Sequence, residues 1–143
     1  MFRRLVTSAA LSIALVTSAL AADGKTHRVA IQVDQNDPAV MNMVLNNATN
    51  VIEYYRGKSE DVDVEIVAYG PGIELLRSES PARKQVESLI SQGVRFDVCL
   101  NTVDTIERET GRRPEIIPAA TPVQVGVGQI LFLTENGYTL VRP

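Results

Sequence analysis

Segments with the apolar spacing of strands and of helices alternate along the chain from residue 27 onward. The spacing predicts strands over 27–33 and 62–69, with a helix over 38–56 between them. Apolar side chains recur at helical spacing in that segment, at Val40, Val44, Ala48, Val51 and Tyr55. Asp37 followed by Pro38 is typical of a helix start, and Gly57 of a helix end.

The middle of the chain continues this alternation. We expect a helical turn, a helix, a strand, a helix and a short fourth strand over residues 73–76, 80–93, 96–100, 101–110 and 115–118. Ser80 and Pro81 repeat the cap-and-proline signal of a helix start. Asn101 or Thr102 can cap the helix that follows the third strand, and Gly111 ends it.

The last segment is ambiguous from local propensity. Residues 123–133 hold two glycines and several β-branched side chains, which favour a strand. The order of the whole chain favours a helix instead, because a helix followed by a strand over 138–141 completes five β-α units. Gly137 also suits a helix end. We therefore predict a helix over 123–133.

This alternation defines the fold class. Parallel neighbouring strands need crossover connections, so strands that alternate with helices imply a sheet covered on both faces. The expected architecture is a three-layer α/β/α domain with a mainly parallel five-stranded sheet. Its length is that of one domain, over residues 22–143.

The first 21 residues predict a cleavable signal peptide. Arg3 and Arg4 give a basic start, an apolar run follows, and Ala19-Leu20-Ala21 places small residues where signal peptidase cuts. The alternative is a membrane anchor, but the run is shorter and less apolar than the roughly 20 residues that a spanning helix needs. The sequence therefore predicts a periplasmic or secreted protein that has no membrane segment after cleavage.

The charge of the predicted mature chain argues against a nucleic-acid partner. The 14 Lys and Arg of the chain fall to 12 when Arg3 and Arg4 are removed, against 17 Asp and Glu. Binding to phosphates requires Lys and Arg gathered on one surface, and no such cluster occurs here.

Cys99 is the only cysteine, so the domain forms no internal disulfide. With His27 as the only histidine, a Cys/His zinc site is excluded. Gly70-Pro71-Gly72 and Gly126-Val127-Gly128 each begin like a dinucleotide loop but lack the third glycine. We therefore expect neither a metal nor a cofactor.

Ligands of open α/β sheets bind outside the carboxyl ends of the strands. This rule gathers the loops 34–37, 70–72, 99–102 and 119–122 at one edge. We expect Cys99 there as the reactive group, with binding residues Asn36, Gly70, Pro71, Gly72, Asn101 and Thr102.

Two interpretations of Cys99 stay open on these grounds. A helix start lowers the pKa of a thiol and favours the nucleophilic thiolate. The alternative is a small apolar side chain buried in a strand, which is the usual state of free cysteines. His27 opens the first strand, at the opposite edge of the sheet, so a Cys-His pair is not expected and His27 is assigned to the surface.

Three segments resemble the DsrE/DsrF-like family of sulfur-relay proteins. They are 69–76 (YGPGIELL), 93–102 (GVRFDVCLNT) and 136–143 (NGYTLVRP), and the Cys-x-Asn-Thr stretch is the most specific. The resemblance implies a flavodoxin-like sheet, assembly into a homotrimer or homohexamer, and a cysteine that carries sulfur as a persulfide. By that match the carrier is Cys99. Well-known members work in the cytoplasm with donor and acceptor proteins, so an exported member needs a different donor.

Two functions from different classes follow. The first is a sulfur carrier or sulfurtransferase in which the Cys99 thiolate takes up sulfane sulfur, with Asn101 and nearby amides stabilising charge. The second is a non-catalytic oligomeric module that binds a ligand or a partner and keeps Cys99 only for packing. A thiol redox protein is disfavoured because the chain has no resolving cysteine.

Overall fold

The computed structural model describes residues 26–143, so the predicted signal peptide at 1–21 lies outside the described part. Five parallel strands form one sheet in the order β4-β3-β2-β1-β5. Their bounds are His27–Val33 (β1), Val62–Ala68 (β2), Arg95–Cys99 (β3), Thr121–Val123 (β4) and Thr139–Val141 (β5). The predicted three-layer, flavodoxin-like α/β/α architecture is confirmed.

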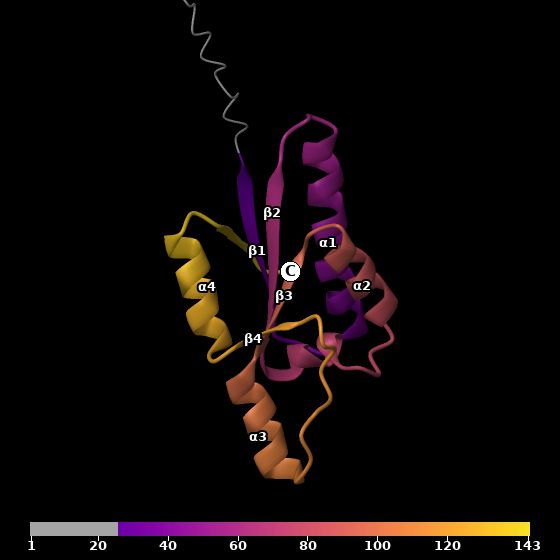
Figure 1. Cartoon of the computed structure of the whole chain (residues 1–143), viewed down its shortest axis with the longest axis vertical. Coiled ribbons are helices and arrows are strands. Elements are labelled where there is room, and N and C mark those ends of the chain that lie inside the picture. Colours follow the sequence, from indigo (N-terminus) through magenta and orange to yellow (C-terminus); the bar gives the residue numbers. More distant parts are fainter. Residues whose placement is uncertain (1–25) are drawn as a thin grey trace, which may run out of the picture.

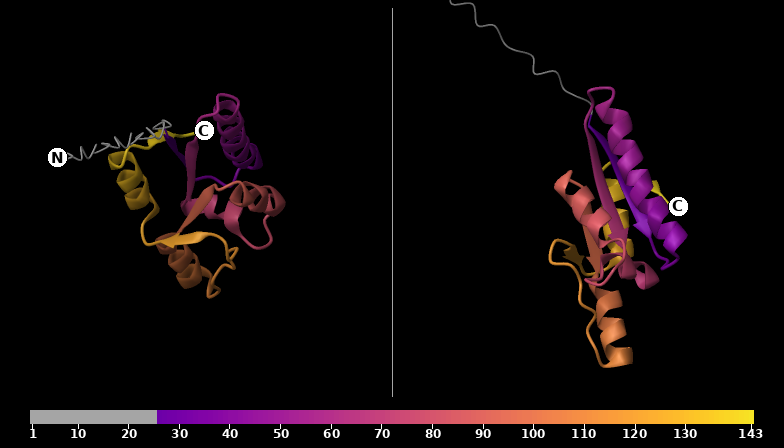
Figure 2. Two further views of the ribbon diagram at one scale, coloured as in Figure 1. Left: turned by 45° about the horizontal axis from the view of Figure 1, so that its top comes forward. Right: turned by 90° about the vertical axis from the view of Figure 1, so that its right-hand side faces the viewer.

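Helices cover both faces of this sheet, as expected (Figure 1). Their bounds are Pro38–Arg56 (α1), Arg83–Ser91 (α2), Leu100–Thr110 (α3) and Gly126–Glu135 (α4), with a 3-10 helix, η1, over Gly70–Leu76. The helices α1 and α2 lie on one face and α4 lies on the other, while α3 extends beyond the edge of the sheet (Figure 2).

The residues that predict the start and the end of α1 occupy these positions in the structure. Asp37 caps the helix, because its Oδ1 accepts a hydrogen bond from the Ala39 N–H at 2.7 Å, and Pro38 occupies the first helical position. The helix ends at Gly57, and its buried side chains pack against β1 and β2.

The predicted helix in the last segment is also confirmed, although it begins at Gly126 because residues 121–123 belong to β4.

Three predicted boundaries are wrong. The fourth strand is not 115–118, because the Ile117 N–H bonds the Leu76 carbonyl and Ile116 bridges Arg77 in an antiparallel sense. The helix α2 begins at Arg83 rather than at Ser80, whose Oγ accepts only the Ala82 N–H at 3.3 Å. Neither Asn101 nor Thr102 caps α3, which begins at Leu100 and has Cys99 at its N-cap.

The main core lies between the sheet and the α1/α2 layer. Strand alternation places Ile31, Ile66 and Phe96 on this face, all almost fully buried. A smaller cluster under α4 consists of Ala30, Val67, Ile130 and Leu133. The rest of the α4 face carries Gln32, Glu65, Asp97 and Cys99, all of which are buried.

Candidate active site

Cys99 lies at the point where two connections leave the sheet in different directions. It ends β3, which leads into α3, while the neighbouring strand β4 leads into α4 on the opposite face from α1 and α2 (Figure 1). Open α/β sheets bind ligands outside the carboxyl ends of their strands, and Cys99 is the last residue of β3. The predicted position of Cys99 at the carboxyl edge of the sheet is therefore confirmed.

The sulfur of Cys99 faces the starts of two helices. Cys99 is itself the N-cap residue of α3, and the N–H of Gly126, the first residue of α4, donates to Sγ at 3.3 Å. Helix starts carry partial positive charge and free N–H groups, so both helices favour a negative sulfur. The residue is only 5% exposed.

The surroundings lower the pKa of the Cys99 thiol below its ordinary value. Burial acts in the other direction, but the Thr102 hydroxyl and the N–H groups of Gly126, Thr102 and Asn101 stabilise the thiolate and outweigh burial. The Cys99 Sγ lies 3.9 Å from the Gln124 carbonyl oxygen, which can accept a weak hydrogen bond from the thiol. The site thus lowers the cost of ionising a buried cysteine.

Gly126 contacts the Cys99 sulfur but is not among the binding residues that the sequence predicts. A Cβ at this position would lie 2.8 Å from Cβ of Tyr69 and 3.2 Å from Cβ of Cys99. Only glycine therefore lets α4 begin this close to the sulfur. The signal available in the sequence is a glycine in the first turn of the helix predicted over 123–133.

The Gly70-Pro71-Gly72 turn supports Thr102. The Gly70 N–H donates to Thr102 Oγ1 at 2.9 Å, and Gly70 has a positive φ of 53°. A Cβ at Gly72 would lie 2.2 Å from the Val33 carbonyl oxygen, so this glycine lets the turn pack against the end of β1. Gly70 thus holds the Thr102 hydroxyl, and Gly72 lets the same turn lie against the end of β1.

A pocket of about 450 Å³ opens between η1 and α3, beside this site. Four of the predicted binding residues line it, together with two carboxylates and two further α3 side chains: Gly70, Pro71, Asn101, Thr102, Glu74, Glu109, Thr105 and Ile106. Asn101 also accepts a hydrogen bond from the Gln124 amide at 2.9 Å. Thr102 and Asn101 both line this pocket and supply hydrogen-bond donors to the Cys99 sulfur, and of the two only Thr102 does so through its side chain.

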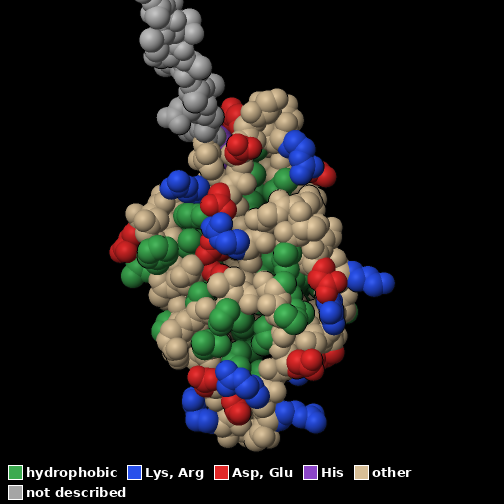
Figure 3. All heavy atoms as spheres, viewed as in Figure 1, with side chains coloured by type: hydrophobic (Ala, Val, Ile, Leu, Met, Phe, Trp, Pro, Cys, Tyr) green, Lys and Arg blue, Asp and Glu red, His purple; other side chains and the backbone are tan. Residues whose placement is uncertain are grey.

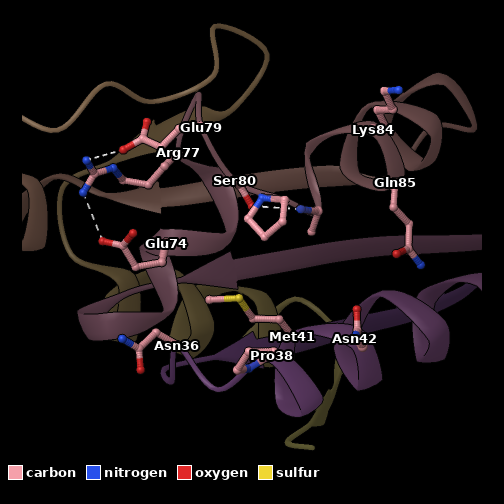
Figure 4. Close-up of a pocket in the computed structure, with 12 residues that line it drawn as sticks. Asn36, Pro38, Met41, Asn42, Glu74, Arg77, Glu79, Ser80, Lys84 and Gln85 are labelled. Atoms are coloured by element: carbon pink, nitrogen blue, oxygen red, sulfur yellow. Dashed lines mark hydrogen bonds and ion pairs between the residues drawn. The ribbon is translucent and has the colours of Figure 1, made fainter.

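Asn36 is not part of this group. It lines a different pocket of about 650 Å³ between the start of α1 and the segment that precedes α2. Figure 4 shows Met41 of α1 facing Ser80 across that space, with Arg77 held between two glutamates. The Arg77 Nη1–Glu74 Oε1 distance is 3.1 Å, and Glu79 pairs with the same guanidinium. The structure thus separates Asn36 from Cys99.

His27 lies at the amino end of β1, far along the strand from the carboxyl edge where Cys99 lies. Its Nε2 pairs with Glu60 at 2.8 Å and its ring stacks on Tyr55, with the two centroids 3.8 Å apart. The expected absence of a Cys-His pair agrees with this placement. These contacts leave His27 partly exposed at the surface of the domain.

A buried acid pair lies on the same strand face as Cys99. Burial raises the pKa of Asp97 to about 8, and a hydrogen bond to Glu65 adds to this effect. Glu65 accepts hydrogen bonds from Gln129 Nε2 and from Arg95 Nε, both at 2.7 Å, and its pKa is lowered in spite of its burial. Burial therefore favours the neutral form of Asp97, whereas the hydrogen-bond donors around Glu65 favour its ionised form.

Neither a metal centre nor a membrane span occurs in the described part of the chain. Among residues 26–143, no three His, Cys, Asp or Glu side chains are grouped so that they could hold a metal ion. No helix in this range has the length and apolar character needed to cross a bilayer.

These features define the class of protein: a flavodoxin-like α/β/α domain with a polarised thiol at the carboxyl edge of its sheet. Within this class, the chain is similar to the solved structure of MTH1491 from Methanobacterium thermoautotrophicum, a protein of unknown function. The two share 30% sequence identity over 82% of this chain and 99% of that one, with a TM-score of 0.71. The chain belongs to the same family as MTH1491. No family model matches the chain, and no curated protein matches it.

Proposed function

We propose that this protein is a sulfur carrier that holds sulfane sulfur on Cys99 as a persulfide. The observation that carries this proposal is the convergence of donors on Sγ: the N–H of Gly126 at 3.3 Å, the Thr102 hydroxyl, and the N–H groups of Asn101 and Thr102. A cysteine kept only for packing has no need of such donors. The resemblance to sulfur-relay proteins in the 93–102 segment points to the same chemistry.

The transfer is a nucleophilic displacement at sulfur. The Cys99 thiolate attacks the outer sulfur of a donor hydropersulfide, R–S–SH, so that a new S–S bond forms and the donor S–S bond breaks. The donor leaves as a thiolate and takes up the proton, and Cys99 becomes a persulfide anion. An acceptor thiolate then attacks the outer sulfur of that persulfide and restores the Cys99 thiolate.

The groups around Sγ favour both steps. Preorganised N–H donors stabilise negative charge on sulfur before the attack and when the acceptor releases Cys99. In this proposal, the pocket between η1 and α3 receives the donor or acceptor, because it is lined by Thr102 and Asn101. Asn36 has no part in the transfer.

The test is sulfur loading of the purified, reduced protein by cysteine hydropersulfide, followed by mass spectrometry of the peptide that contains Cys99. We expect a gain of one sulfur atom that is removed by a reductant and absent from Cys99→Ser. A matched pair sharpens the test, because Thr102 and Thr105 line the same pocket but only Thr102 contacts the sulfur. Thr102→Val should slow loading, whereas Thr105→Val should leave it unchanged.

The second candidate is a non-catalytic module that binds a ligand or a partner. The observation that favours it is the 5% exposure of Cys99, which limits access to the thiol. The rate of reaction of the native protein with iodoacetamide separates the two candidates. A rate comparable with that of a free thiol supports the carrier, and reaction only after unfolding supports the binding module.

We further propose that the chain works as a homotrimer or homohexamer. Support comes from the outer side of α4, where Val127, Leu131 and Phe132 are 58%, 57% and 56% exposed. Figure 3 shows apolar side chains gathered around β4 and the start of α4. A helix that is apolar on all sides is typically covered, and a second copy of the chain is the occupant that the sulfur-relay resemblance implies.

Export is proposed on the sequence alone. The basic start and the Ala19-Leu20-Ala21 motif support cleavage after Ala21, which would place the protein in the periplasm or outside the cell. Mass spectrometry of the protein from its native host should find Ala22 as the first residue. An intact Met1 on most molecules would contradict the proposal.

A further inference from the structure

The pocket between the start of α1 and the segment that precedes α2 takes no part in the sulfur chemistry, because Cys99 does not line it. Its volume of about 650 Å³ is that of a small-molecule site. Among its lining residues, Asn36 follows β1 in the chain and Glu74 follows β2. The pocket therefore lies at the carboxyl edge of the sheet, where open α/β sheets bind ligands.

The middle of this pocket is apolar. Met41 is 8% exposed, and Pro38 lies one helical turn before it on the same side of α1. Pro81 and Ala82 line the pocket from the segment that leads into α2. Figure 4 shows Met41 and Pro38 on one side of the space and Ser80 on the other. An apolar group of a ligand can be buried between these two walls.

Charged side chains lie at opposite ends of the pocket (Figure 4). At one end, Glu74 and Glu79 share the single guanidinium of Arg77, which leaves one negative charge in excess. At the other end, Lys84 forms no ion pair and no side-chain hydrogen bond within residues 26–143. The pocket is therefore negative at the Arg77 end and positive at the Lys84 end.

The pocket also holds amide side chains with unused hydrogen-bonding capacity. The side chains of Asn36 and Asn42 have no hydrogen-bond partner in the described part of the chain, and Gln85 makes only a long bond of 3.4 Å to Asn46. Each amide offers a carbonyl that accepts and an NH₂ group that donates. A peptide group needs both, since it carries one N–H and one C=O.

We propose that this pocket binds a short peptide of two or three residues with free termini. Its amino terminus lies at the end formed by Glu74 and Glu79, its carboxylate pairs with Lys84, and an apolar side chain packs on Met41. The amide side chains bond the peptide groups between the two ends. A purely anionic ligand such as a nucleotide matches Lys84 but meets the excess carboxylate at the other end.

The test is a ¹⁵N–¹H NMR titration of the purified protein with the tripeptide Ala-Leu-Ala. We expect saturable shifts of the backbone amides of Met41, Ser80 and Gln85, whereas Thr105, which lines the other pocket, should not shift. Acetylation of the amino terminus or amidation of the carboxylate removes one charge from the peptide. Each blocked peptide should bind about twofold to fivefold more weakly, as the loss of an exposed ion pair implies.

Two substitutions test the orientation of the peptide. Lys84→Met should weaken binding of Ala-Leu-Ala by about twofold to fivefold and leave binding of the amidated peptide unchanged. Glu79→Gln leaves Arg77 paired with Glu74 alone, so it should weaken the free peptide to a similar degree and spare the acetylated one.

Lys58→Met and Glu53→Gln are the matched controls, because they remove the same charges from residues that do not line the pocket. Both should bind Ala-Leu-Ala as the wild type does. Absence of saturable shifts at millimolar peptide overturns the proposal, and so do equal affinities of the free and the blocked peptides. This inference goes beyond the proposed function, and none of these outcomes depends on the reactivity of Cys99.

Discussion

The two faces of the sheet are formed by alternate residues of the same strands, yet they differ in chemistry. On the α1/α2 face, the buried positions of β1, β2 and β3 present apolar side chains to the helices, Ile31, Ile66 and Phe96 among them, and the polar exception is His27 at the amino end of β1. On the α4 face, the intervening positions carry Glu65 and Asp97 beside a four-residue apolar cluster. A strand period of two is what allows one segment to supply both surfaces.

The apolar α1/α2 face therefore contributes mainly to the stability of the fold, whereas the polar α4 face surrounds the reactive thiol. The α1/α2 face can be packed densely because nothing on it needs a proton, a charge or access to a ligand. The α4 face holds a charged network in place of part of its core, and this network lies directly beside Cys99. Changes on the first face should therefore act on folding, and changes on the second should act on the thiol.

The largest expected effect is a cavity in the α1/α2 core. Phe96→Ala removes a fully buried aromatic side chain and should lower the free energy of unfolding by about 3–5 kcal/mol. Ile130→Ala, in the smaller cluster under α4, should cost about 2 kcal/mol, the low end for an isoleucine, because Ile130 is near the edge of its cluster. Urea unfolding measures both, and equal losses would contradict the comparison.

The second effect is the pH dependence of stability that Asp97 introduces. Its pKa is about 8 in the folded protein and near 4 when unfolded, so the native state binds one proton more between these values. Stability is therefore greatest near pH 4–5 and falls as pH rises towards 8, by up to about 1.4 kcal/mol for each pH unit. Glu65 has a lowered pKa, so its ionisation contributes stability that is lost only as the pH falls below the ordinary pKa of a glutamate.

Asp97→Asn is the matching variant for that measurement. Asparagine keeps the shape and can still donate to Glu65, but it does not titrate. Chemical unfolding between pH 5 and 7.5 should give a falling stability in the wild type, by about 3 kcal/mol, and a flat profile in the variant. The same slope in both proteins would show that Asp97 is not the group responsible.

A smaller effect on stability, with a large effect on the thiol, is expected from Gly126→Ala. The added Cβ would meet Tyr69 and Cys99 at 2.8 and 3.2 Å, so the start of α4 must shift. We expect a loss of about 1–3 kcal/mol and a clear fall in the alkylation rate of Cys99.

Gly128→Ala is the control for the same helix. Its Cβ would meet only Val125 atoms, the nearest at 3.4 Å, on the exposed side. Alanine should stabilise α4 by up to about 1 kcal/mol and leave the thiol unchanged. Equal effects of the two substitutions on the alkylation rate would remove Gly126 from the site.

Much of this organisation was predictable from the sequence. Apolar periodicity and the Asp37-Pro38 cap identify α1, and the rule for open α/β sheets places Cys99 at the carboxyl edge. The short edge strand β4 was not predictable, because Pro122 lies within it and weakens the local strand signal. Proline is tolerated there because an edge strand bonds on one side only.

The chemistry around Cys99 was less predictable, because it depends on residues far apart in the sequence. Acidic residues at 63 and 65 alternate with apolar ones along β2, which indicates a polar face. Their pairing with Arg95 and Asp97 follows only once the register of β2 against β3 is known. The approach of Gly126 to Cys99 likewise requires the crossing of α4 over the sheet.

The smallest expected effect on the stability of the monomer comes from the outer side of α4. Leu131 is 57% exposed, so Leu131→Glu should change the free energy of unfolding by no more than about 0.5 kcal/mol. The same substitution places a charge on the surface that we propose to be covered by another copy, so it should convert a trimer or hexamer to monomers in light scattering. Met43→Glu is the control, because Met43 is 48% exposed on α1, on the opposite face. If only the α4 face mediates assembly, that variant keeps the size of the wild type. A monomeric wild type, or dissociation by both substitutions, would contradict the assignment of assembly to α4.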